Sequence, residues 1–132
     1  MNIDQGRVLV KPMLHSQLTE TILGCCFETI NELGIGFSEK IYQRALIIAL
    51  REKGLSVGVE VPYKVYFRGS QVGHYIADIL VEGVILVELK VCKSLLPENM
   101  AQVINYLKAS NLEVGLLVNF GQAHLEYKRL FR

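Results

Sequence analysis

Charged residues interrupt two segments of the chain that are otherwise apolar. Asp78 lies within YIADILV, and Glu88 and Lys90 lie within VILVELKV. The second segment has the composition of a strand buried on both faces, where an unpaired charge is costly. Residues two apart on a strand point to the same side, so Glu88 and Lys90 share a face. Charges kept at such a cost indicate a chemical role.

The turn between the two segments decides whether the acidic residues meet. If a three-residue loop is centred on Gly83, Asp78 and Glu88 stand opposite each other on neighbouring antiparallel strands and share a face. A two-residue turn would put the carboxylates on opposite faces. We predict the three-residue loop, with glycine supplying a left-handed bend.

Two facing carboxylates repel each other unless a cation lies between them. Their hard oxygen atoms suit Mg²⁺ or Mn²⁺. An ammonium group beside them can neutralise negative charge on a reacting group or orient a water molecule. This combination suits hydrolysis of a phosphodiester, because the metal ion lowers the pKa of its bound water and offsets charge on the phosphate.

Hydrophobic periodicity and turn residues predict the elements that carry these side chains. The order α-α-β-β-β-α-β indicates an α/β fold with a mixed sheet flanked by helices. Residues 1–14 form a lead-in, and residues 15–132 form a single domain. The predicted elements are helices 15–33 and 38–53, strands 55–67, 72–81 and 84–91, helix 93–110, strand 112–120, and a tail at 124–131 that is either a strand or a short helix.

Composition narrows the class of protein. The 132 residues are 51% hydrophobic, with a mean hydropathy of +0.30, which fits one compact domain. No apolar run reaches membrane-spanning length and no export signal is visible, so a cytoplasmic protein is expected. The net charge is only +1, so contact with phosphate backbones must come from local patches, a second subunit or a partner.

Three motifs together resemble a known family. Asp78, nine residues and then Glu88-Leu89-Lys90 match the D-x(n)-E-x-K core of the PD-(D/E)XK, restriction-endonuclease-like superfamily, although Ala77 stands where the named motif has proline. The segment GFSEKIY is similar to the signature of a small group called GxxExxY proteins, and AQVINYL and GLLVNFG resemble later segments of that group. The resemblance implies a restriction-endonuclease-like α-β-β-β-α-β core with an extra N-terminal helix.

The resemblance also implies roles for individual residues. Asp78 and Glu88 would hold the metal ion, Mg²⁺ or Mn²⁺, assisted by the backbone carbonyl of Leu89. Glu39, on the second helix, would be an accessory acidic residue that reaches over the sheet toward the metal. Lys90 would assist the attacking water or steady the phosphate.

One further pair is implied on the third helix. Gln102 and Tyr106 lie one helical turn apart and so share a side of that helix. The superfamily often places a Gln-x-x-x-Tyr pair there, lining the site.

The expected function is metal-dependent hydrolysis of phosphodiesters in DNA or RNA, that is, a nuclease. The alternative is the same fold with a quiescent site, which binds nucleic acid or a protein partner. A third hypothesis is an interaction protein, an obligate dimer in which Lys90 pairs across a subunit boundary. A homodimer is attractive in each case, because two copies double the basic area that can grip a duplex.

Simpler explanations exist for the individual residues. Glu88 and Lys90 would form cross-strand salt bridges if they lay on a solvated face. Glu39 would be favoured near the start of a helix by the helix dipole alone. Gln102 would be an ordinary surface amide. Placement of these side chains decides between the explanations.

Overall fold

The computed structural model describes residues 13–132, so most of the predicted lead-in lies outside the described residues. The predicted order of elements is confirmed, and the tail is a strand. The elements are α2 (Ser16–Leu33), α3 (Glu39–Glu52), β1 (Val57–Phe67), β2 (Ser70–Val81), β3 (Ile85–Lys90), α4 (Pro97–Ser110), β4 (Val114–Asn119) and β5 (Glu126–Phe131).

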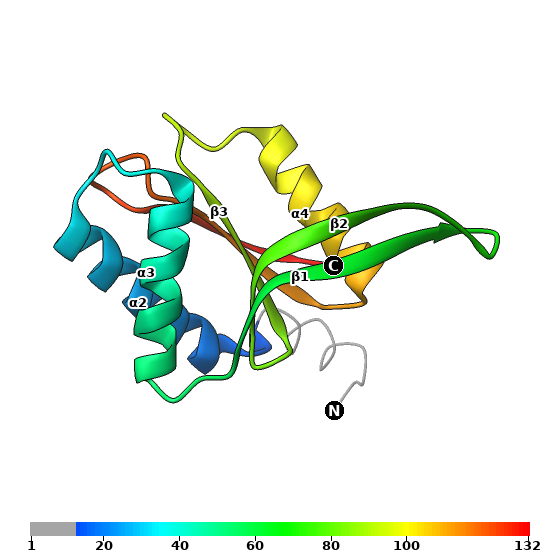
Figure 1. Cartoon of the computed structure of the whole chain (residues 1–132), viewed down its shortest axis with the longest axis horizontal. Coiled ribbons are helices and arrows are strands. Elements are labelled where there is room, and N and C mark those ends of the chain that lie inside the picture. The colour runs from blue at the N-terminus through cyan, green and yellow to red at the C-terminus, as the bar shows by residue number, and fades with distance from the viewer. Residues whose placement is uncertain (1–12) are drawn as a thin grey trace, which may run out of the picture.

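The strands form one mixed sheet in the order β1-β2-β3-β4-β5. β3 and β4 are parallel and joined through α4, whereas the other neighbouring pairs are antiparallel. Figure 1 shows α2 and α3 on one side of this sheet and α4 on the other. No helix in the described range is long and apolar enough to span a bilayer.

β3 lies at the centre of the sheet and is covered on both faces. Ile85, Val87 and Leu89 pack in the core formed with α2 and α3, whereas Leu86 packs in the core formed with α4. Glu88 follows Leu86 on the α4 face by strand alternation. The buried strand predicted from the sequence is therefore confirmed, and Glu88 and Lys90 lie on the face of β3 that is turned toward α4.

The loop between β2 and β3 has the predicted three-residue length. It spans residues 82–84, and the backbone turns through Glu82 (φ 53°) and Gly83 (φ 68°), both in the left-handed region. The register pairs Ile79 with Val87 and Val81 with Ile85. Continued by one residue, this register places Asp78 opposite Glu88.

The β1–β2 hairpin projects from the sheet as a long arm (Figure 1). β2 pairs with β3 only from Ile79 to Val81, and the rest of the hairpin extends beyond β3 without pairing with it. The arm is attached to α4 by stacked tyrosine rings: Tyr75 lies between Tyr63 and Tyr106, at centroid distances of 5.3 and 3.8 Å. The arm therefore begins at Asp78.

Candidate active site

The side chains of Asp78 and Glu88 interlock across the point where β2 leaves β3. The Asp78 backbone N–H donates to Glu88 Oε1 at 3.1 Å, and the Leu89 N–H donates to Asp78 Oδ2 at 2.8 Å. Each carboxylate thus accepts a hydrogen bond from a backbone N–H of the facing strand. The two acidic groups share one face, as the register predicts.

The backbone of Asp78 is held by side chains and not by a strand ladder. The β1–β2 pairing passes from Val59↔Ile79 to Val61↔Ala77 and omits Glu60, whose φ of 50° bends β1 at this point. The Asp78 carbonyl accepts a hydrogen bond from Gln43 Nε2 at 2.9 Å. The Asp78 N–H donates to Glu88, so side chains satisfy both backbone groups of Asp78 and neither is left unpaired where the ladders are interrupted.

Glu88 is a buried carboxyl with an acidic neighbour. It is only 5% exposed, so the hypothesis of a solvated face for Glu88 is wrong. Burial and the charge of Asp78 raise the pKa of Glu88 to about 8, although the Asp78 N–H bond and the nearby Lys90 oppose this shift. Both causes penalise the ionised form. A proton or a cation at this position therefore stabilises the pair.

Glu39 approaches the same pair from α3. It is the first residue of that helix. Partial burial of its carboxyl raises its pKa, and the charge of Asp78 adds to this effect while Lys90 opposes it. Glu39 is therefore within electrostatic reach of Asp78 and Lys90, although it is an exposed residue. Its place in the first turn is also favoured by the helix dipole, and the two roles are compatible.

The loop before α3 is fixed by the tyrosine of the G-x-x-E-x-x-Y motif. Tyr42 is fully buried, and its hydroxyl donates to the Gly34 carbonyl at 2.5 Å while accepting from the Phe37 N–H at 3.3 Å. Its ring stacks on Phe120 at 5.0 Å. These contacts set where α3 begins, and they therefore set the position of Glu39.

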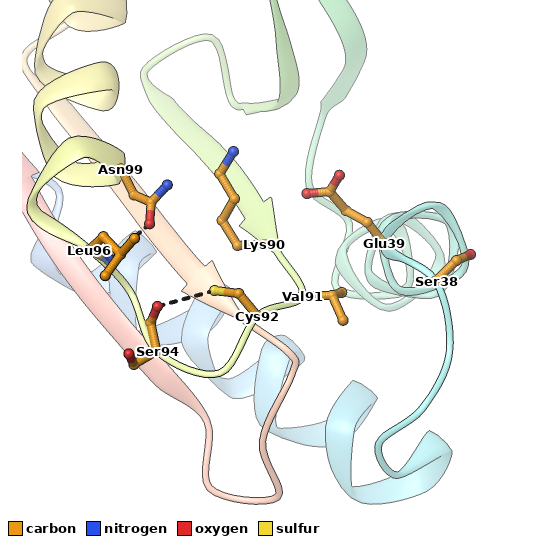
Figure 2. Close-up of a pocket in the computed structure, with 8 residues that line it drawn as sticks. All are labelled: Ser38, Glu39, Lys90, Val91, Cys92, Ser94, Leu96 and Asn99. Atoms are coloured by element: carbon orange, nitrogen blue, oxygen red, sulfur yellow. Dashed lines mark hydrogen bonds between the residues drawn. The ribbon is translucent and has the colours of Figure 1, made fainter.

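Glu39 and Lys90 line one open pocket of about 490 Å³. In Figure 2 the Glu39 carboxylate and the Lys90 ammonium enter the same space from α3 and β3. Asn99 faces them from the start of α4, and the loop 91–96 forms the floor. Lys90 itself is half-buried. Asp78 and Glu88 are not among the residues that line this pocket, so the pocket does not decide on the interaction-protein hypothesis.

Asn119 fixes the loop that follows Lys90. It is fully buried at the end of β4, where its Oδ1 accepts from the Cys92 N–H at 3.0 Å and its Nδ2 donates to the Cys92 carbonyl at 2.9 Å. The same Oδ1 accepts from the Gly121 N–H at 2.9 Å, and Nδ2 also donates to Glu126. This clamp holds the pocket floor against β4.

The two α4 residues expected at the site differ in placement. Tyr106 lies near the acidic pair, since its pKa is raised by burial and then by the charges of Glu88 and Asp78. Gln102 is exposed and is not among the residues that line the pocket. Asn99, one turn earlier, lines it instead. A role for Gln102 stays a prediction.

The donor set suits a hard divalent cation. Within residues 13–132 no three His, Cys, Asp or Glu side chains are grouped closely enough to hold a metal ion by themselves. Mg²⁺, however, is usually bound through one or two carboxylates, with water completing the shell. Asp78 and Glu88 supply two carboxylates whose oxygens face each other. N–H and C=O groups of one strand residue point toward the same neighbouring strand, so the Leu89 carbonyl also faces Asp78.

Two comparisons with known proteins found matches. A model of the PD-(D/E)XK nuclease superfamily matches residues 16–130. The chain is also similar to a solved protein, "Crystal structure of SSO0001", at 20% identity and a TM-score of 0.54. The match covers 71% of this chain and 50% of that one, so this chain spans about half the length of that protein and shares its fold. No curated protein matches the chain.

Proposed function

Because the chain belongs to the PD-(D/E)XK nuclease superfamily, we propose that it is a metal-dependent phosphodiester hydrolase that acts on DNA or RNA. One observation carries the proposal: the carboxylates of Asp78 and Glu88 lie together where the β2–β3 pairing ends, each accepting a backbone N–H of the other strand. Glu88 is buried and Asp78 is half-buried, and two acidic groups at such positions are unfavourable unless a cation or a proton lies between them.

The residues present fit Mg²⁺ or Mn²⁺. Asp78, Glu88 and the Leu89 carbonyl would hold the ion, and Glu39 would act as an accessory acidic group. When bound, such an ion lowers the pKa of coordinated water and offsets charge on the phosphate. The raised pKa of Glu88, with burial as its largest cause, supports this assignment, because a cation removes the penalty that ionisation of this group carries.

The remaining groups position the substrate. The Lys90 side chain lines the pocket at the end of β3. There it would bind a phosphate oxygen and stabilise the charge that develops on it. In this proposal Glu39 would accept a proton from a water molecule near that phosphate. Membership in the GxxExxY group is part of the proposal, supported by the way Tyr42 fixes the loop that leads to Glu39.

Cleavage assays with isosteric variants test the proposal. Labelled single-stranded DNA, duplex DNA and RNA are incubated with Mg²⁺, Mn²⁺ or EDTA. Asp78→Asn and Glu88→Gln should each lower metal-dependent cleavage by at least about 100-fold, because each removes a charged ligand of the metal ion that would activate water. Glu20→Gln, at an exposed position on α2, is the matched control and should cleave like the wild type.

The outcomes separate this proposal from its rival. Cleavage by Asp78→Asn at the wild-type rate would refute the assignment of the site. Metal-independent binding of nucleic acid with no cleavage by the wild type would favour the quiescent module. The cytoplasmic location and the homodimer expected from the sequence belong to the same proposal. They are checked by cell fractionation and by light scattering.

A further inference from the structure

The β1–β2 arm has a charge distribution unlike that of the rest of the chain. Between residues 61 and 77 the charged side chains are Lys64 and Arg68, joined by His74, and there is no Asp or Glu. The whole chain, by contrast, has 14 basic and 13 acidic residues. A basic projection on a nearly neutral protein indicates an anionic partner.

The end of the arm also exposes aromatic rings. Tyr66 and Phe67 are each 59% exposed, and the Arg68 guanidinium lies over the Phe67 ring at 4.8 Å. Flat exposed rings beside cationic groups are the surface on which unpaired bases stack while the adjoining phosphates are neutralised. Bases inside a duplex are already stacked on each other, so these rings favour a single strand.

A groove beside the arm continues this surface. Lys64 and Tyr66 of β1 line it together with Asn105 and Lys108 of α4, and it measures about 550 Å³. Lysine therefore flanks the groove on both sides. This spacing of cations around an aromatic residue matches a nucleic-acid backbone that carries bases on one side.

The groove and the acidic pair are connected through α4. Asn105 lines the groove, and its neighbour Tyr106 lies within electrostatic reach of Glu88. β2 carries Asp78 at the base of the arm, and Tyr75 of the same strand stacks on Tyr106 at 3.8 Å. A strand bound along the groove would thus run beside the elements that carry the carboxylates.

We propose that the arm and its groove bind single-stranded nucleic acid, with phosphates on Lys64 and Lys108 and bases stacked on Tyr66 and Phe67. The inference rests on the proposed function only in taking nucleic acid as the ligand. It adds the form of that ligand and the surface that holds it.

Binding in the absence of metal tests this surface. A fluorescein-labelled 20-nucleotide thymidine oligomer is titrated in EDTA, with anisotropy as the readout, at several salt concentrations. Tyr66→Leu keeps apolar bulk but loses the flat ring and should weaken binding about tenfold, whereas Tyr66→Phe should bind like the wild type. A duplex of the same length should bind more weakly than the single strand.

The lysines are tested by the salt dependence of the same titrations. Lys64→Gln and Lys108→Gln should each reduce the slope of log affinity against log salt by about 0.7. Lys128→Gln is the matched control, because Lys128 is exposed on β5, at the opposite edge of the sheet from β1. That variant should leave the slope unchanged. All variants are compared with the wild type by thermal unfolding.

Three results would overturn the inference. The first is equal binding of the oligonucleotide by Tyr66→Leu and Tyr66→Phe. The second is an equal salt slope for the variants of the groove lysines and for Lys128→Gln. The third is a shift of Tyr66→Leu from dimer to monomer with unchanged affinity for the oligonucleotide. The last result would assign the arm to pairing of two copies. Because binding is measured without metal, arm-dependent binding without any cleavage would uphold this inference and refute the hydrolase proposal.

Discussion

Replacing Glu88 by glutamine should stabilise the metal-free protein. Glutamine keeps the size of the side chain and the oxygen that accepts from the Asp78 N–H, and its amide can donate to the Asp78 carboxylate. What is lost is the charge of a carboxyl that is only 5% exposed and faces another carboxyl. Removing a charge buried beside a like charge relieves desolvation and repulsion together.

The size of the effect follows from the pKa of Glu88. A shift from 4.5 to about 8 makes the folded state favour the protonated form. Each pKa unit corresponds to about 1.4 kcal/mol, and relaxation of the pair toward water reduces the sum, so we expect a gain of about 3 kcal/mol at pH 8. For a protein of this size that raises Tm by about 10 °C.

The sign of the pH dependence is fixed by the direction of the shift. An acid whose pKa is raised by folding stabilises the fold fully below its unfolded pKa, and this contribution is lost as pH rises through the folded value. For Glu88 the loss falls between pH 4.5 and about 8. Unfolding in urea with EDTA should therefore show a small difference between Glu88→Gln and wild type near pH 4.5, and a large one at pH 8.

Two further measurements complete this test. Glu20→Gln, an exposed control on α2, should leave the stability within about 0.5 kcal/mol of wild type at every pH. Millimolar Mg²⁺ should raise the Tm of the wild type and have little effect on Glu88→Gln, because a ligand of the folded state stabilises it by mass action. A Glu88→Gln protein less stable than wild type at pH 8 would refute the reasoning, since Glu88 would then be a satisfied charge.

Two other substitutions probe the parts of the fold that place the site. Tyr42→Phe removes the hydroxyl that donates to the Gly34 carbonyl and should cost about 1–2 kcal/mol in urea unfolding, while a change below about 0.5 kcal/mol would show that the loop holds without it. Gly121→Ala would place a methyl group 2.6 Å from the Cys92 nitrogen. We expect it to cost about 2 kcal/mol or more and to lower cleavage, whereas wild-type stability would show that the pocket floor can move.

The sequence is informative where local chemistry decides the structure. Gly83 and the length of the loop fix the register of β2 and β3, so the facing of Asp78 and Glu88 is predictable from the residues alone. The buried β3 strand is likewise evident from its β-branched composition. The order of elements follows from periodicity, and the mixed sheet follows from that order.

The sequence is less informative where distant elements meet. Gln43 and Asn119 are ordinary polar residues in a helix and a strand, and only the packed fold reveals that they hold backbone groups of Asp78 and Cys92. Their one sequence signal is a polar side chain at a position that the periodicity predicts to be buried. Asn99 lines the pocket, and Gln102 is not among its lining residues. Helical spacing does not give the tilt of α4 against β3, so the turn of α4 that reaches the pocket could not be predicted from the sequence.

The β1–β2 ladder and the β2–β3 ladder are both interrupted at the level of Asp78. Glu60 leaves the β1–β2 ladder at the level of Asp78, and the pairing of β2 with β3 ends one residue away, at Ile79. A continuous ladder would satisfy the backbone of Asp78 with main-chain bonds, whereas here Gln43 and Glu88 do so with side chains. We therefore expect that a substitution restoring regular pairing at Glu60 would change the direction of the arm and the position of Asp78 together.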